Sequence, residues 1–330
     1  MEQNKTQNNQ GVQFATIYKI ASGIVIAALM IVGAVAFSLS FDPGSRYFLS
    51  SPVVIALYIA IGTAVLFALS AFFILKGLST APQSAATKKS TAALSAIASA
   101  VPFIYYIYSD VSAKIDALSA TPGSLAASYS GLDTLSAIIT ATAAFSLICS
   151  LYLIIRDSKI AYLLAGYGRV IFLALIITKL YLDFSVELNS PVKILVQFAA
   201  VAAMLATTAK LRPIIGKPRA AAFMSAQFLS AALCLLCFTL FAAEIAPHFA
   251  KYTADLFVFP IMLLVLGIES VVLLLTCRTT SADTPIEVSE AEAEKCTDET
   301  DCETDCETDC AADEATSNEE ASDPTETSDQ

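Results

Sequence analysis

Residues 182–195, LDFSVELNSPVKIL, join two long apolar runs through a short polar link. Pro191 stands where the second run begins. Proline is favoured in the first turn of a helix, because its ring presets φ and its missing N–H would have no partner there. Ser51-Pro52-Val53 opens an earlier apolar run in the same way. We therefore interpret both stretches as turns that lead into membrane-spanning helices.

The charges of the chain are few and unevenly distributed. Charged residues make up 15% of the 330 positions and apolar residues 56%, whereas a soluble domain has about 25% charged residues. From position 281 onward the sequence has 19 Asp and Glu against the single Lys295, so this tail carries −18 and the rest of the chain +7. The acidic pI of 4.6 therefore describes the tail, and the body has the composition of a membrane protein.

Eight apolar runs have the length needed to cross a hydrocarbon layer of about 30 Å as helices rising about 1.5 Å per residue. The predicted spans are 18–40, 52–75, 92–108, 134–155, 160–182, 191–208, 220–245 and 255–277. We expect helices because each segment must satisfy its own backbone groups in lipid. The predicted fold is an all-α, polytopic membrane bundle with a disordered N-terminus at 1–17 and a disordered, acidic low-complexity tail at 279–330.

Two segments allow a second interpretation. Ala34-Val35-Ala36 in the first run is compatible with a signal-peptide cleavage site, although the apolar run continues beyond it. In the long link 109–133, Val111, Ile115 and Leu118 have the spacing of one helix face. This part of the link is either an interfacial helix or a solvated loop.

The basic residues predict the orientation, because cytoplasmic links of membrane proteins are enriched in Lys and Arg. With eight spans, one side receives Lys5, Lys19, Lys76, Lys88, Lys89, Arg156, Lys159, Lys210, Arg212, Lys217, Arg219 and Arg278. The other side receives Arg46, Lys114, Lys179, Lys193 and Lys251. We expect a multi-pass plasma-membrane protein with both termini in the cytoplasm.

The Ser-Pro openings at positions 52 and 191 also suggest an internal repeat. Two four-helix halves of this kind would share one orientation and form a parallel repeat. The alternative is that Ser-Pro is favourable helix-start chemistry used twice. The sequence leaves both interpretations open.

The stretch 182–195 resembles a segment of uncharacterised multi-spanning membrane proteins from clostridia-like bacteria. The resemblance covers roughly residues 160–210, which include the two spans on either side of that link. It implies a bacterial plasma membrane. That group has no assigned activity, so the resemblance implies no catalytic or binding residue.

Arg169 and Glu269 are the candidate site residues. If the fifth span began only after Arg169, it would cover about 22 Å, which is too short. Arg169 therefore lies within the membrane, about 14 Å from the cytoplasmic end of its span, and Glu269 lies about 12 Å from the same face. Opposite charges at matching depth predict an intramembrane ion pair. The alternatives are a snorkelling Arg169 and a protonated Glu269 bonded to a neighbouring helix.

The remaining reactive residues give no catalytic constellation. Cys234 and Cys237 share one helix face among Leu, Ala and Phe, which favours packing over redox chemistry. A single histidine, His248, excludes an H-E-x-x-H zinc site, and the chain has no phosphate-binding loop motif. The thrice-repeated Glu-Thr-Asp-Cys at 299–310 is either low-complexity sequence or a soft-metal site. We expect no enzymatic activity, no cofactor and no nucleic-acid partner.

The sequence favours a non-enzymatic scaffold, accessory or sensor subunit whose acidic tail binds a protein partner. The alternative is a small-solute transporter with a site between the two halves near Arg169, Glu269 and Pro260, the last of which could kink its helix. The interior distinguishes the two. A polar path that reaches the charged pair favours transport, whereas a dry interior favours a scaffold.

Overall fold

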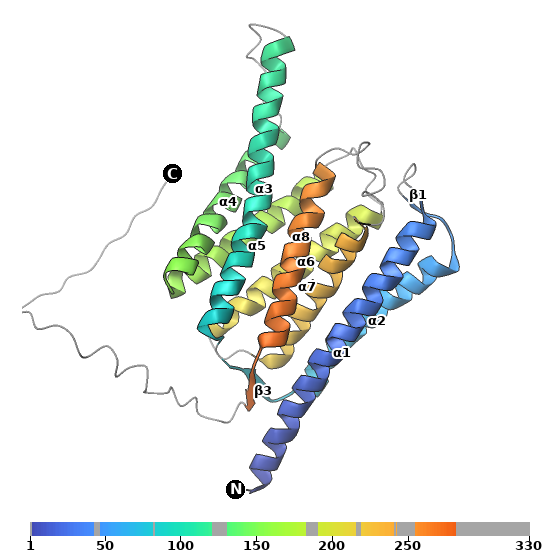
Figure 1. Ribbon diagram of the computed structural model, residues 1–330, viewed down its shortest axis with the longest axis vertical. Helices are drawn as coiled ribbons and strands as arrows, with labels where there is room; N and C mark the ends of the chain where they lie inside the picture. The colour runs from blue at the N-terminus through green and yellow to red at the C-terminus, as the bar shows by residue number, and fades with distance from the viewer. Residues whose placement is uncertain are drawn as a thin grey trace, which may run out of the picture. The chain divides into compact units, whose positions relative to one another are not determined.

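Eight helices form the fold of the computed structural model, which describes residues 2–42, 47–81, 83–120, 131–182, 191–215, 219–240, 242 and 255–281. The helices are α1 (Glu2–Ser40), α2 (Pro52–Ile74), α3 (Ala85–Ala120), α4 (Gly131–Ile155), α5 (Lys159–Leu182), α6 (Pro191–Ile215), α7 (Ala220–Leu240) and α8 (Asp255–Thr276) (Figure 1). Each contains a stretch that is long and apolar enough to span a membrane. The predicted polytopic helical fold is confirmed.

Three predicted helix boundaries are corrected. Helix α1 begins at Glu2, so residues 2–17 are helical and not disordered. Helix α3 extends to Ala120, so residues 109–120 continue the spanning helix. Helix α6 continues to Ile215, beyond the predicted end at 208. The common reason is that a helix already formed in the span gains one hydrogen bond for each added residue, whether or not that residue is apolar. The tail 282–330, with its Glu-Thr-Asp-Cys repeat, lies outside the described residues.

Helices α3 to α8 form a closed ring. Each packs against the next one along the chain, and α3 packs against α8 to complete the circle. We call this part the six-helix ring. Helices α1 and α2 lie side by side outside it and pack on α7 (Figure 1).

The packing does not divide the chain into two equivalent halves. Helix α6 packs on the helices before and after it, α5 and α7. Its counterpart in a repeat, α2, packs on α1 but on α7 in place of α3. The Ser-Pro opening is explained by helix-start chemistry instead. The Ser51 hydroxyl accepts a hydrogen bond from the backbone N–H of Val54 at 3.4 Å, and Pro52 is the first residue of α2. Helix α6 likewise begins at Pro191, as predicted.

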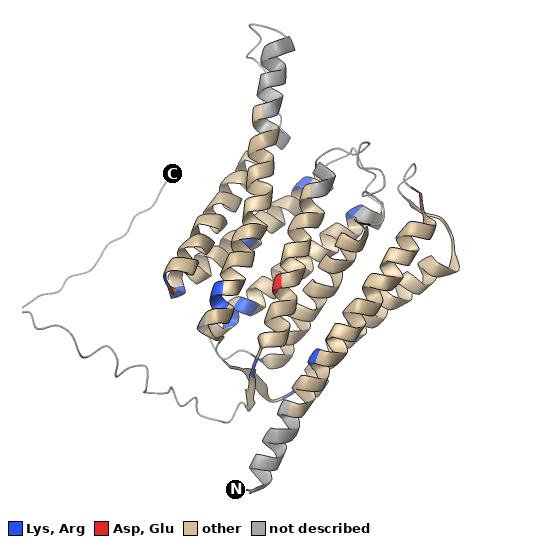
Figure 2. Cartoon of the chain, in the orientation of Figure 1, with Lys and Arg blue, Asp and Glu red and all other residues tan. Residues whose placement is uncertain are grey.

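Most of the described Lys and Arg gather at one end of the bundle, which we call the basic end (Figure 2). A small sheet lies there: β3 (Leu78–Thr80) pairs antiparallel with β4 (Thr279–Ser281). Lys19 of α1 donates hydrogen bonds to the carbonyls of Leu275 and Cys277, where α8 ends. At the opposite end, β1 (Phe41–Asp42) pairs with β2 (Tyr47–Phe48). These short strands, which we did not predict, pair backbone groups beyond the helix ends.

Two apolar clusters form the core. One lies between α1, α2 and α7, where the Tyr18 ring stacks on Phe67 at 4.8 Å and Phe228 packs against both. The other lies inside the six-helix ring and contains Phe172, Leu173 and other side chains of α3 to α8. Large apolar side chains also cover the outside of the bundle and remain exposed, as expected of helices surrounded by lipid.

Candidate functional site

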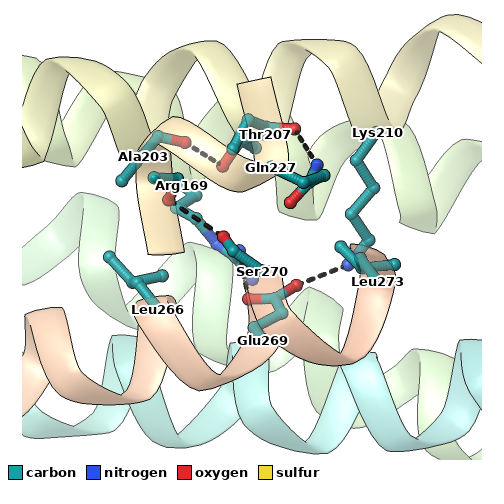
Figure 3. Close-up of a pocket in the computed structure, with 11 residues that line it drawn as sticks. Arg169, Ala203, Thr207, Lys210, Gln227, Leu266, Glu269, Ser270 and Leu273 are labelled. Atoms are coloured by element: carbon teal, nitrogen blue, oxygen red, sulfur yellow. Dashed lines mark hydrogen bonds and ion pairs between the residues drawn. The ribbon is translucent and has the colours of Figure 1, made fainter. Parts of the chain in front are cut away.

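Arg169 of α5 and Glu269 of α8 meet inside the six-helix ring. The guanidinium Nη1 lies 2.6 Å from the carboxylate Oε2, and the two residues are 3% and 2% exposed (Figure 3). Arg169 stands ten residues after the start of α5 and Glu269 seven before the end of α8. These positions correspond to depths of about 15 and 10 Å from the basic end. The two side chains that the sequence predicts at matching depth are therefore within hydrogen-bond distance.

Lys210 of α6 is a third member of the site, which the sequence analysis missed. Its Nζ lies 2.7 Å from the other carboxylate oxygen, Oε1 of Glu269, and the residue is 7% exposed. The predicted end of the sixth span at 208 places Lys210 in a basic link. The missed signal is the spacing of Ala203, Thr207 and Lys210, which places them on one helix face at i, i+4 and i+7.

This charge cluster, Arg169, Lys210 and Glu269, contains two cations and one carboxylate. The Nε–H of Arg169 is buried without a hydrogen-bond partner. Gln227 of α7 donates from Nε2 to the carbonyl of Ala206 at 2.8 Å, and its buried Oε1 accepts no bond. Buried polar atoms are nearly always paired with protein or water. The cluster and the neighbouring Gln227 thus retain one donor and one acceptor without partners, and the cluster has one more basic than acidic side chain.

Three small cavities lie between the charge cluster and the basic end. The cluster cavity, of about 10 Å³, is lined by Arg169, Lys210, Glu269 and Gln227 among others. The middle cavity, of about 20 Å³, shares Arg169 and Lys210 with it and extends to Tyr162. The entrance cavity, of about 40 Å³, shares Tyr162 with the middle cavity. A cavity of roughly 10–15 Å³ holds one water molecule, so each of the three cavities has room for one to a few water molecules. We call the row of three neighbouring cavities the cavity file.

The entrance cavity is also lined by Lys88 of α3 and by Asp157, which follows α4. The two side chains form a salt bridge of 2.8 Å and are 39% and 66% exposed. Partial exposure of both groups means that solvent screens the pair and that it contributes little to stability. The mouth of the cavity file therefore lies at the solvent-exposed basic end.

Serine hydroxyls form a polar contact between α3 and α4, beside the middle cavity. Ser95 lies 3.1 Å from Ser150, and Ser99 donates to Ser146 at 3.0 Å. Ser146 in turn donates to the carbonyl of Ala165 on α5 at 3.2 Å. Small residues with hydroxyls allow helices to approach closely and to bond across the interface in lipid. Ser95 also contributes to the wall of the middle cavity.

On the side away from the basic end, the ring interior next to the charge cluster is apolar. Phe172, Leu173 and Ile176 of α5 are completely buried, and Met262 and Leu263 of α8 pack in the same cluster. We call these five side chains the apolar seal. The charge cluster therefore has the cavity file on the side of the basic end and close-packed apolar side chains on the other side.

The other candidate residues do not join the cluster. Cys234 and Cys237 are buried in α7, where the Cys234 thiol lies 3.6 Å from the carbonyl of Ala199. Pro260 lies nine residues before Glu269 in α8, about 14 Å away along the helix. His248 lies outside the described residues. Within the part of the chain that the structure describes, no three His, Cys, Asp or Glu side chains are placed to hold a metal ion.

The position of the site within the chain also differs from the prediction. Arg169, Lys210, Gln227 and Glu269 belong to α5, α6, α7 and α8. The charge cluster is thus built from the second half of the chain, whereas the wall of the middle cavity includes Ala92 and Ser95 from the first half. Helices α3 and α4 contribute the outer wall of the middle and entrance cavities.

Comparison of the chain with protein-family models, with curated proteins and with solved structures finds no match. The function is therefore inferred from the geometry of the charge cluster and its cavities.

Proposed function

We propose that the protein is a small-solute transporter and that the charge cluster is its central binding site. The observation that supports this is the cavity file between the basic end and Arg169, Lys210 and Glu269. A scaffold would be expected to have a dry interior at this depth. The polar path favours the transporter, the second of the two functions that the sequence leaves open.

The cost of the cluster supports the same function. A charged side chain near the middle of a membrane helix costs about 2.5–3.5 kcal/mol even on insertion scales. Apolar residues of similar volume often replace a buried ion pair without loss of stability. A group of three charges with an unpartnered donor at Arg169 and an unpartnered acceptor at Gln227 is therefore better explained by binding than by helix packing.

The orientation follows from the charges of the links. By the positive-inside rule the basic end faces the cytoplasm, and the bacterial plasma membrane suggested by the sequence resemblance is compatible with this. The structure then corresponds to a state that is open toward the cytoplasm by narrow cavities and closed toward the outside by the apolar seal. Transport requires a second state in which α5 and α8 separate at Phe172 and Leu263.

Single cysteines in the otherwise cysteine-free full-length protein test this proposal in membrane vesicles of both orientations. Thr207→Cys reports on the cluster and middle cavities, and Leu263→Cys on the apolar seal. A cysteine that has bound Ag⁺ no longer reacts with maleimide. The extent of the silver reaction is therefore measured as the loss of maleimide labelling after the protein is denatured. We expect Thr207→Cys to react from the cytoplasmic side, and Leu263→Cys to react more slowly from the outside.

The scaffold interpretation predicts a different result. In a dry and static interior, neither cysteine reacts from either side, and the transporter proposal is then rejected. Reaction of Thr207→Cys alone, with Leu263→Cys inert, would indicate a cytoplasmic ligand sensor that does not transport. Ser84→Cys, at an exposed position of the basic end before α3, is the control for reagent access from the cytoplasmic side.

A further inference from the structure

Resting on the transporter proposal above, we infer that the middle cavity binds one small inorganic monoanion of halide size. The first observation is the sign of the charges that line it. Arg169 and Lys210 both contribute to its wall, and its described lining residues include no Asp or Glu. The carboxylate of Glu269 lines the cluster cavity instead.

The charge balance of the site supports an anion. Glu269 neutralises only one of the two cations that it contacts, at 2.6 and 2.7 Å. A net positive charge buried among membrane helices is unfavourable unless a counter-charge accompanies it. One monovalent anion beside Arg169 and Lys210 makes the cluster neutral, whereas a divalent anion would leave it negative.

The remaining wall of the middle cavity is also suited to an anion. Ser95 and Tyr162 supply hydroxyl groups, which can turn an O–H toward a negative ion, whereas the O–H of Thr207 donates to the carbonyl of Ala203 at 2.8 Å. Arg169 has one buried N–H without a partner. The Nζ of Lys210 contacts Glu269 and also lies 5.2 Å from the centre of the Tyr162 ring. Lys210 lines both the cluster cavity and the middle cavity.

The size of the cavity limits the ligand further. About 20 Å³ is room for one or two water molecules, and a chloride or bromide ion is only slightly larger than water. Sulfate and organic carboxylates carry several heavy atoms and do not fit without movement of the helices. Ala92, Ala165 and Gly166 line the space, and a Cβ at Gly166 would lie 2.6 Å from a Leu211 methyl group. The small residues therefore create the available space.

Equilibrium binding of radioactive chloride to the purified full-length protein in detergent tests this inference, with competition by bromide, sulfate and gluconate. We expect saturable binding of one chloride per chain, which bromide displaces and the two larger anions do not. Lys210→Met should weaken binding by about tenfold or more, equivalent to about 1.4 kcal/mol. Ala92→Leu, which fills the cavity without changing any charge, should abolish binding.

Lys159→Met is the matched control, because Lys159 is an exposed lysine at the start of α5 that lines none of the three cavities. We expect its chloride affinity to stay within about twofold of the wild type, since exposed charges are screened. Each variant is first checked for its elution volume in size-exclusion chromatography. Absence of saturable chloride binding in the wild type overturns the inference, as does unchanged binding in folded Lys210→Met and Ala92→Leu.

The binding assay and the vesicle assay separate the two proposals. If chloride binds as described but Leu263→Cys never reacts from the outside, the anion site stands and transport is rejected. If both reporter cysteines react as expected but chloride does not bind, the transporter stands and the ligand assignment is rejected.

Discussion

Replacing Glu269 by Gln tests whether this carboxylate holds the cluster together. Glu269 accepts from Arg169 at 2.6 Å and from Lys210 at 2.7 Å, and all three side chains are buried. The neutral amide leaves two cations without a counter-charge. Loss of one partner from a buried ion pair typically costs about 3–5 kcal/mol, so we expect Glu269→Gln to lower the free energy of unfolding by at least this amount.

Lys210→Met is the informative comparison, because it removes the excess charge and leaves the Arg169–Glu269 pair neutral. Glu269 loses one charge-assisted hydrogen bond, worth about 1.5–3 kcal/mol, but the cost of burying the ammonium group disappears as well. We expect a net change below about 1.5 kcal/mol. The double variant Glu269→Gln/Lys210→Met should be more stable than Glu269→Gln alone, because only one cation remains in the apolar interior.

The free energy of unfolding is measured by sodium dodecyl sulfate titration of the protein in mild detergent, followed by circular dichroism because the chain has no Trp. Lys88→Met breaks the partly exposed salt bridge to Asp157 and should cost no more than about 1 kcal/mol. If the double variant is no more stable than Glu269→Gln, or if Lys210→Met is equally destabilising, the excess-charge explanation is wrong.

Three further predictions concern other parts of the fold. A Cβ at Gly267 would lie 3.0 Å from a side chain of α7, so Gly267→Val should lower the unfolding free energy by about 1–3 kcal/mol. A Cβ at Gly62 meets nothing within 4 Å. Gly62→Val should therefore change the unfolding free energy by less than about 0.5 kcal/mol. Burial raises the pKa of Cys277, which lies just beyond α8, to about 11. Its alkylation rate should therefore keep rising with pH up to that value, while the rate of an exposed Ser84→Cys levels off near pH 8.5; a plateau near pH 8.5 for Cys277 contradicts the burial. Lys19→Met removes the cation at the C-terminal end of α8 and should cost about 0.3–1 kcal/mol in detergent unfolding, a loss that Lys19→Arg should largely avoid.

The spanning helices could be predicted from the sequence because the bilayer fixes their length and polarity. Helix α2 ends at Ile74 and α4 at Ile155, each within one residue of the predicted boundary. Two of the three corrected boundaries concern helix ends outside the hydrocarbon layer. Residues 2–17 and 109–120 are polar enough to suggest loops, but polarity does not end a helix that the span has already nucleated.

The ion pair and the third charge differ in what the sequence reveals about them. Depth along a helix can be calculated from residue counts, and on this basis Arg169 and Glu269 were expected to meet. Which helices are neighbours, and which face each presents, depends on tertiary packing. The closed ring of α3 to α8 therefore could not be derived from the apolar pattern.

The position of Lys210 changes the balance between the scaffold and the transporter interpretations. The positive-inside rule treats every Lys close to a span end as a marker of the cytoplasmic surface, and Lys210 was counted in that way. With Lys210 outside, Arg169 and Glu269 form a neutral pair that requires no ligand. With Lys210 buried 2.7 Å from Glu269, the same site carries one excess positive charge beside two cavities. Moving one ammonium group from the surface into the bundle thus changes the expected role of the site from helix packing to anion binding.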